Sequence, residues 1–322
     1  MAGSRPLATL EVTNSGDLKQ AVEMRVMTAE RPAVEQQQWF STWFDSSHYH
    51  QLYGYRDEAE AARFIDALVD RLRPDRQARM LDLGCGAGRH ANYLASKGFR
   101  VTGLDLAAGS IREAANHAPP AARFARHDMR EPFGDAAFDY VFNFFTSFGY
   151  FDTLNEHLAV VWNIAHALRV GGAVVIDYLN VRHAEARLTS REVKSLGGVT
   201  YRITRWCDAR HFYKRLIVED PRLQGPVQHV ERVAKFTLRD FQCMFAINGL
   251  SLEDVRGDYQ LGPYDALESP RMILMARKRQ PAQNCGADPC LDRFLRIRES
   301  VSGVSPRYDA SIHCGTRDAI DG

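Results

Sequence analysis

Between residues 79 and 178 the chain alternates short apolar runs with longer segments in which apolar residues recur every three or four positions. Short apolar runs are typical of buried strands, and the longer spacing is typical of amphipathic helices. Strands joined by helical crossovers form a parallel sheet with helices on both faces. We therefore predict strands over 79–83, 100–105, 122–126, 138–144 and 173–178, separated by helices over 88–97, 107–116 and 154–169, the last helix being ended by Gly171 and Gly172.

The segment before the first strand is predicted to be helical. Residues 57–72 have the apolar spacing of an amphipathic helix. Residues 34–55 are rich in aromatic side chains, and Trp39 and Trp43 lie four positions apart, which indicates one face of a short helix. We interpret residues 34–73 as a helical N-terminal cap. Its aromatic residues either cover the core or close over a ligand, and the candidates for closure are Tyr49, Tyr53 and Arg56.

After residue 178 the pattern changes to alternation with hairpin signals. Turns are indicated at Gly197–Gly198 and near Asp208. We predict an antiparallel lid insertion over about 185–236, then a helix over 238–247 and final strands over 251–256 and 271–277. The predicted fold class is α/β: a seven-stranded, mostly parallel, doubly wound sheet with an antiparallel β insertion after the fifth strand.

The two ends of the chain lack this regularity. Residues 1–33 are polar and without sustained periodicity, so we interpret them as a mobile leader. Residues 280–322 lose the apolar periodicity and are predicted to be disordered. A single domain over 34–279 remains between them.

Charge and hydropathy narrow the possible partners. The formal net charge is +1, and we find neither a basic run nor an appended RNA-binding module, so we predict no nucleic-acid partner. No apolar run reaches the roughly 18 residues that a membrane span requires. The N-terminus lacks the apolar core of a signal peptide. These features predict a cytoplasmic protein without a membrane partner.

The six cysteines are scattered along the chain, which predicts free thiols. Cys285 and Cys290 are five positions apart, and their spacing does not match that of a zinc site. We predict no bound metal.

The most informative stretch is MLDLGCGAGRH, residues 80–90. A buried strand here ends in glycines at alternate positions, Gly84, Gly86 and Gly88, and a helix follows. Glycine tolerates positive φ and has no Cβ, so the backbone can turn sharply and approach a ligand closely. A strand, a glycine-rich turn and a helix N-terminus together favour a nucleotide-like ligand at the carboxyl edge of the sheet.

Acidic residues follow the next two strands at the same edge. Asp105 ends the second strand, 21 positions after Gly84, where a carboxylate can accept both hydroxyls of a ribose. Its alternative role is to cap the helix over 107–116. Asp128 follows the third strand and could accept from an adenine amino group while Met129 packs on the ring, although it could also be a surface turn residue.

The fourth strand ends in Asn143, and the loop FFTSFGYFD follows it. Thr146, Ser147 and Tyr150 could line the place where a reacting group emerges, while the phenylalanines either pack in the core or form walls that attract a cation. The fifth strand and the insertion supply further polar residues. Our candidates for catalysis are Tyr150, Tyr178, Asn180 and His211, of which His211 could act as a base near pH 7.

The order of five motifs, LDLGCGAGRH, VTGLD, HDMREPF, FDYVFNFFTSFGYF and LRVGGAVVIDYLN, resembles the class I S-adenosylmethionine-dependent methyltransferases. The resemblance covers roughly residues 35–278 and is greatest to the bacterial small-molecule branch with a β-hairpin insertion. It implies a Rossmann-like fold whose seventh strand, over 271–277, is antiparallel to the rest. It also implies methyl transfer from S-adenosylmethionine to a small-molecule acceptor.

The resemblance assigns roles to particular residues. Gly84, Gly86 and Gly88 would lie against the methionine part of the cofactor, with Asp82 beneath its amino group. Asp105 would hold the ribose, and Asp128 and Met129 the adenine. We include Leu106 and Asn143 among the cofactor-binding residues. No general base is implied.

Two alternatives compete with this interpretation. A dinucleotide-binding enzyme would carry G-x-G-x-x-G, but here the third glycine comes one residue early and position 89 is Arg89. A non-catalytic or regulatory protein could keep the same fold and still bind S-adenosylmethionine. The Arg, Lys and aromatic residues of the insertion would suit a polar or anionic acceptor, or simply a solvated sheet face.

Overall fold

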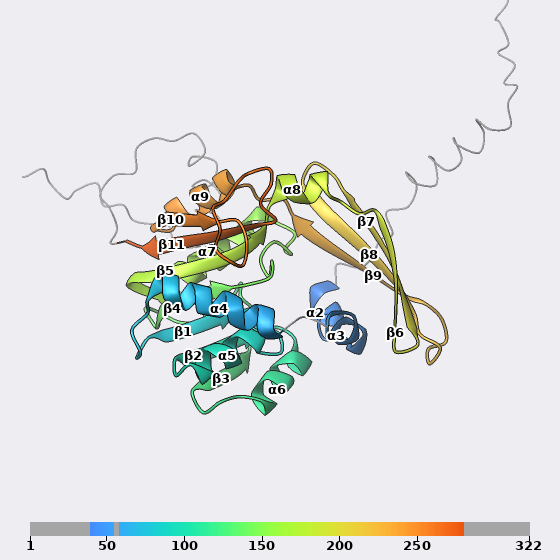
Figure 1. Ribbon diagram of the computed structural model, residues 1–322, viewed down its shortest axis with the longest axis horizontal. Coiled ribbons are helices and arrows are strands. Elements are labelled where there is room, and N and C mark those ends of the chain that lie inside the picture. Colours follow the sequence, from blue (N-terminus) through green and yellow to red (C-terminus); the bar gives the residue numbers. More distant parts are fainter. Residues whose placement is uncertain (1–38, 55–57, 280–322) are drawn as a thin grey trace, which may run out of the picture. The chain divides into compact units, whose positions relative to one another are not determined.

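Figure 1 shows the computed structural model of the protein, which describes residues 39–54 and 58–279. The predictions of a mobile leader over 1–33 and a disordered tail over 280–322 concern residues outside these ranges, as does the prediction for Arg56.

The main sheet has seven strands in the order β10-β11-β5-β4-β1-β2-β3 (Figure 1). All neighbouring strands are parallel except β11, which is antiparallel to both β10 and β5. This arrangement confirms the predicted mostly parallel sheet with a reversed last strand. The strands are β1 (Arg79–Leu83), β2 (Arg100–Asp105), β3 (Ala122–Arg126), β4 (Phe138–Asn143), β5 (Leu168–Leu179), β10 (Leu250–Arg256) and β11 (Arg271–Lys278).

Both faces of this sheet are covered by helices. Alternate side chains of a strand point to opposite faces, so Leu81 and Met80 of β1 enter different apolar clusters. The cluster around Leu81 contains α7 (Leu154–Ala167) and α9 (Leu238–Ala246), and the cluster around Met80 contains α4 (Glu58–Leu72) and α5 (Arg89–Ser96). Helix α6 (Ala108–Asn116) contacts β2 and β3. The sheet is therefore doubly wound, as predicted.

One boundary differs from the prediction. The helix expected over 154–169 ends at Ala167, and β5 begins directly at Leu168, so Gly171 and Gly172 lie inside the strand. The pairing of β4 with β5 shifts register before residue 173. A Cβ on Gly172 would lie 2.9 Å from the carbonyl oxygens of Arg169 and Asp139, so the glycine permits a close backbone approach rather than ending a helix.

The insertion after β5 forms a second sheet of four antiparallel strands, in the order β6-β7-β8-β9. Its strands are β6 (Arg191–Leu196), β7 (Val199–Cys207), β8 (His211–Glu219) and β9 (Val227–Ala234). Gly197 and Gly198 both have positive φ and form the predicted first turn. A short helix that the sequence pattern did not predict, α8 (Val181–Ala186), connects β5 to this sheet.

The predicted N-terminal cap is divided between the two sheets. Its first part forms two short helices instead of one, α2 (Trp39–Trp43) and α3 (Ser47–Tyr53), because Ser46 caps the second by accepting a hydrogen bond from the backbone N–H of Tyr49. Trp43 and Leu52 pack into an apolar cluster with the antiparallel sheet. Helix α4 packs instead against the main sheet. Only α2 and α3 therefore share an apolar layer with the antiparallel sheet of the insertion.

Cys85 and Cys207 are free thiols, as predicted, whereas Cys243 is disulfide-bonded, so the prediction is wrong at that position. Within residues 39–54 and 58–279, no helix has the length and apolar character needed to cross a membrane.

Candidate functional site

A cavity of about 630 Å³ opens at the carboxyl ends of the parallel strands. Its walls come from the loop after β1, the residues that follow β2, β3 and β4, helix α3 and strand β9. This is the edge at which open parallel sheets bind their ligands. Six of the predicted cofactor residues line it: Gly84, Gly86, Asp105, Leu106, Asp128 and Met129.

The glycine loop follows the wall closely, and both of its lining glycines, Gly84 and Gly86, have positive φ values that favour glycine. Gly84 has φ +78°, and a Cβ there would lie 2.8 Å from the Cβ of Ser147. Gly86 has φ +55°, and a Cβ there would meet no atom within 4 Å, because it would point into open space. Gly88 does not line the cavity but begins α5 as its N-cap. The loop therefore leaves bare backbone facing the cavity.

Asp105 fixes this loop from the neighbouring strand. Its Oδ2 accepts a hydrogen bond from the N–H of Gly86, and its Oδ1 accepts one from the N–H of Ala107, both at 2.8 Å. Burial raises the pKa of Asp105, while the hydrogen bonds from Ala107 and Gly86 act in the opposite direction. The N-cap of α6 is Ala107, so Asp105 supports the helix start without being its cap. The same carboxylate lines the cavity.

Asp82 and Asn143 lie behind the loop rather than in the cavity wall. Both are 1% exposed, and the amide of Asn143 donates to the carbonyl of Leu83 at 2.7 Å. The Oδ2 atom of Asp82 is buried without a hydrogen-bond partner among the described residues. Burial, followed by the charge of Asp105, raises the pKa of Asp82 to about 7. Asp82 therefore has a pKa near neutral pH and lies two positions before Gly84, where the glycine loop begins.

This raised pKa predicts how stability depends on pH without a ligand. The folded pKa is about 7 against an ordinary value of 3.8, so the contribution of Asp82 to stability is complete below about pH 3.8 and is lost as the pH rises through 7. At about 1.4 kcal/mol per pKa unit the loss is roughly 4 kcal/mol. We expect Asp82→Asn to gain stability relative to the wild type by up to that amount between pH 4 and pH 8, measured by urea unfolding. A difference that is constant with pH would contradict this.

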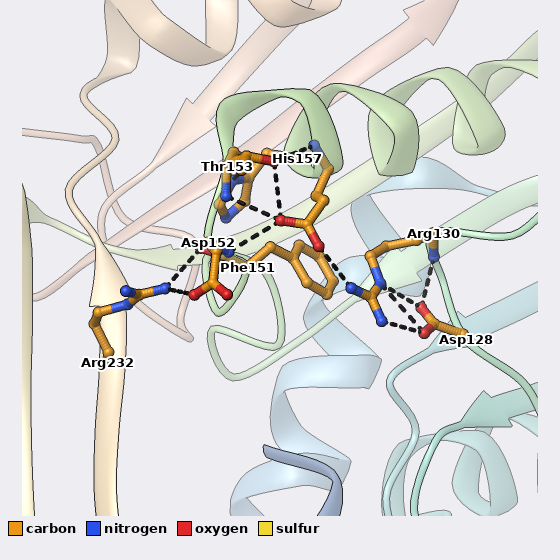
Figure 2. A network of polar contacts seen from close by, with 8 residues as sticks. Asp128, Arg130, Phe151, Asp152, Thr153, His157 and Arg232 are labelled. Carbon is orange, nitrogen blue, oxygen red and sulfur yellow. Dashed lines mark hydrogen bonds and ion pairs between the residues drawn. The ribbon is translucent and has the colours of Figure 1, made fainter. Parts of the chain in front are cut away.

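Asp128 belongs to a charged network below the loop after β4 (Figure 2). Arg130 donates from Nε to Oδ1 and from Nη2 to Oδ2 of Asp128, and its Nη1 donates to Glu156 at 2.6 Å. Burial raises the pKa of Asp128, but the hydrogen bonds from Arg130 outweigh it and the net shift is downward. The sequence did not predict this partner. Asp128 is thus an ionised residue of the cavity wall, already oriented by Arg130.

The same network connects the loop after β4 to the insertion. Figure 2 shows Arg232, on β9, pointing toward Asp152, with which it forms an ion pair. Thr153 and Glu156 form a capping box at the start of α7. His157 donates from Nδ1 to the carbonyl of Thr153 at 2.8 Å, and burial lowers its pKa to about 4, so its ring is neutral at pH 7. These contacts hold the end of the loop, where α7 begins.

A second network holds the start of this loop, where Phe145 and Thr146 have positive φ values of 55° and 59°. The fully buried carboxylate of Asp177 accepts from the N–H of Phe145 at 2.8 Å and from Nε of Arg271 at 2.7 Å. Arg271 also donates to the hydroxyl of Thr146 at 2.9 Å. Because Phe145 lines the cavity, this pair of charges determines the shape of the wall.

The four candidates for catalysis lie in different surroundings, and only one of them lines the cavity. Tyr150 lines the cavity. Tyr178 is completely buried, and its hydroxyl donates to the carbonyl of Ala234. Asn180 is 2% exposed and donates to three carbonyls, one of them that of Ser269 at 2.8 Å. His211 lies near Asp208 at the β7–β8 turn and is not among the cavity residues. Tyr178 and Asn180 thus have partners that stabilise the fold and do not line the cavity, so the prediction that they are candidates for catalysis is wrong.

The cavity also has a wall that the sequence mostly did not predict. Tyr49 and Tyr53, the alternative ligand-closing residues, do line it, together with Phe40, Phe44 and Glu231. Glu231 is the cavity residue contributed by the insertion, within the described part of the chain. It sits in an alternating strand where no local sequence signal distinguishes it. The described residues contain no group of three or more His, Cys, Asp or Glu side chains placed to bind a metal.

Comparisons with known proteins agree with this fold. Residues 80–172 match a family model described as a methyltransferase domain. The chain is 28% identical over 210 residues to dTDP-3-amino-3,4,6-trideoxy-alpha-D-glucopyranose N,N-dimethyltransferase of Streptomyces venezuelae, covering 63% of this chain and 87% of the relative. It is 31% identical over 155 residues to ubiquinone biosynthesis O-methyltransferase of Paracidovorax citrulli, covering 46% of this chain and 61% of that one.

A solved structure extends the similarity to three dimensions. S-adenosylmethionine-bound CalS10, an amino pentose methyltransferase from Micromonospora echinaspora, is 25% identical with a TM-score of 0.53 over 72% of this chain and 97% of its own. The strand order and the antiparallel β11 are those expected from the resemblance, and these matches point to the same kind of protein. The fold and these matches support a class I S-adenosylmethionine-dependent methyltransferase. The comparisons favour an enzyme of this family over the dinucleotide-binding and non-catalytic alternatives.

Proposed function

We propose that the protein transfers the methyl group of S-adenosylmethionine to an amino group of a small, sugar-like molecule. The observation that carries the proposal is the cavity in which bare glycine backbone, Asp105 and the Asp128–Met129 pair come together. Two of the proteins similar to this chain are named for methylation of amino sugars, which supports this class of acceptor. A cytoplasmic location and the absence of nucleic-acid and membrane partners belong to the same proposal and rest on composition.

The residues present fit the cofactor. A Cβ at Gly86 would point into open space, so the loop leaves room for a ligand against its backbone. We assign the ribose hydroxyls to Asp105 and the adenine to Asp128, Met129 and Leu106. The buried Oδ2 of Asp82 has no hydrogen-bond partner among the described residues, and we assign Asp82 to the methionine amino group above the loop. Gly88 and Asn143 would act indirectly, by positioning α5 and the end of β1.

The bound cofactor supplies an electrophilic methyl group on a sulfonium. The task of the protein is to align the acceptor with that carbon and to exclude water, and alignment alone can contribute roughly 7–11 kcal/mol. Tyr150 and the aromatic residues of α2 and α3 line the acceptor side of the cavity. Their ring faces favour a cation once water is removed. We therefore assign orientation and water exclusion to this wall and assign no general base.

Thermal unfolding tests whether the cofactor binds, which the proposed function requires. A ligand at 100 times its dissociation constant adds about 2.7 kcal/mol of stability. For a domain of this size we expect the melting temperature to rise by roughly 5–10 °C with S-adenosylmethionine or S-adenosylhomocysteine. NAD serves as the control and should produce no shift. The absence of a shift with both adenosyl ligands would contradict the proposal, and labelled methyl transfer into a small-molecule extract tests turnover.

A further inference from the structure

The charge of the cavity wall limits which acceptors it can bind. Five carboxylate side chains line the cavity, whereas the one Lys or Arg side chain among the described lining residues is Arg89. The five are Glu58, Asp105, Glu113, Asp128 and Glu231. Basic partners compensate some of them, Arg130 for Asp128 and Lys214 for Glu231. Carboxylate side chains still outnumber Lys and Arg side chains among the described lining residues, which favours a cation over an anion.

Glu231 is held so that one of its oxygens remains available. Its side chain is 15% exposed, and its Oε1 accepts from Nε1 of Trp43 at 2.8 Å. The hydroxyl of Tyr53 and Nζ of Lys214 also donate to Oε1, each at 3.4 Å. Every hydrogen bond that the described residues make to this carboxylate thus falls on Oε1. Oε2 remains to accept a donor group from a ligand in the cavity.

Aromatic rings connect Glu231 to the loop after β4. The ring centroids of Tyr49 and Tyr53 are 4.7 Å apart, and those of Phe44 and Tyr49 are 5.0 Å apart. Phe44 in turn lies 5.2 Å from Tyr150. A carboxylate at the end of a continuous aromatic wall combines the two groups that bind an organic ammonium. These residues come from α3, the segment after α2, strand β9 and the loop after β4, and not from the glycine loop.

We propose that Glu231 is an acceptor-binding residue and that the acceptor is a small molecule whose amino group donates to Oε2. An acceptor that arrives as an ammonium loses one proton to solvent, and the nitrogen lone pair then takes the methyl group as S-adenosylhomocysteine leaves. This inference rests on the proposed function and adds the residue that selects the acceptor by charge. It also replaces the expectation that the basic residues of the insertion suit an anion. Arg202 and Arg205 form ion pairs with Glu219 and Glu192 on the antiparallel sheet and do not line the cavity.

Labelled methyl transfer tests the inference without knowledge of the acceptor. The purified full chain is incubated with S-adenosylmethionine carrying a labelled methyl group and a small-molecule extract of the encoding organism. The products are then separated by cation and anion exchange at neutral pH. We expect the label in the fraction that a cation exchanger retains. Label confined to the anion-exchange fraction would overturn the inference while leaving methyl transfer intact.

Variants then test Glu231 itself, with the labelled fraction as the substrate source. We expect Glu231→Gln to lower transfer about tenfold or more at limiting acceptor, because a charge-assisted hydrogen bond is lost. Affinity for S-adenosylhomocysteine should stay within about twofold, which also shows that the variant is folded. Glu231→Asp keeps the charge and should still favour cationic products. Glu219→Gln, on the same sheet but outside the cavity, is the matched control and should transfer like the wild type.

The outcomes separate the two proposals. A wild-type protein that fails to bind S-adenosylhomocysteine, or binds it without transferring label, contradicts the proposed function and with it this inference. Normal transfer by Glu231→Gln at limiting acceptor overturns the role of Glu231 and leaves the proposed function standing.

Discussion

Replacing Asp177 by Ala is expected to lower the free energy of unfolding by about 3–5 kcal/mol, because it leaves the charge of Arg271 unpaired inside the protein. Asp177 is 0% exposed and also accepts hydrogen bonds from the N–H of Phe145 and the hydroxyl of Tyr259. The variant removes all of these together. The left-handed residue Phe145 then loses the carboxylate that accepts from its N–H and supports its conformation. Urea unfolding at constant pH measures the effect.

Two further variants sharpen this prediction. Asp66→Ala removes an exposed partner of Lys97 and is expected to cost at most about 1 kcal/mol. The double variant Asp177→Leu with Arg271→Met removes both charges, so we expect it to be more stable than Asp177→Ala. An Asp177→Ala protein as stable as Asp66→Ala would mean that the buried pair does not hold the loop. Weaker binding of S-adenosylhomocysteine by Asp177→Ala would connect the pair to the cavity as well.

The second large effect is expected at Asp105. Asp105→Ala should weaken binding of S-adenosylhomocysteine by about 1–3 kcal/mol, or roughly 5- to 150-fold, because it removes a charged acceptor of two hydrogen bonds. Isothermal titration measures the affinity. Glu219→Gln, outside the cavity, is the control and should bind like the wild type. Unchanged affinity in Asp105→Ala would remove this residue from the site.

A ligand analogue distinguishes direct from indirect loss at Asp105. The same carboxylate also accepts from the N–H of Gly86, so the variant could act by disturbing the loop. A 2′,3′-dideoxy analogue of S-adenosylhomocysteine lacks the hydroxyls that Asp105 is proposed to hold. If the contact is direct, the wild type discriminates between the two ligands and Asp105→Ala does not. Equal discrimination by both proteins would indicate that Asp105 acts only through the loop.

Helices α2 and α3 and the antiparallel sheet of the insertion pack on each other, so neither segment can be removed without exposing the other. The sequence suggested a separate helical cap and a separate lid, and each could have been removed alone. In the structure, Trp43 and Leu52 are buried against Val199, Tyr201 and other residues of the antiparallel sheet. Deleting the insertion would expose these side chains. Point substitutions such as Glu231→Gln are therefore the better test of this side of the cavity.

Much of the main sheet could be predicted because its signals are local. The apolar runs of β1, β2 and β5 identify buried strands, and parallel strands place their carboxyl ends at one edge. That rule alone brings Gly86, Asp105 and Asp128 together from three separate segments, and the structure places all three in one cavity. The boundary at Gly171 was missed because a glycine that permits close backbone contact looks the same in sequence as one that ends a helix.

The sequence by itself determined the parallel sheet, the glycine loop and the acids that follow β2 and β3, because periodicity and strand direction depend on neighbouring residues. Only the tertiary structure decided the acceptor side of the cavity. Trp43 and Glu231, which are hydrogen-bonded, are separated by 188 positions, and no periodic pattern carries information over such a distance. The tertiary structure likewise buried Tyr178 and Asn180 and left Tyr150 at the cavity. A polar side chain is available to a ligand only where other protein groups have not already taken its hydrogen bonds. Those groups come from distant parts of the chain.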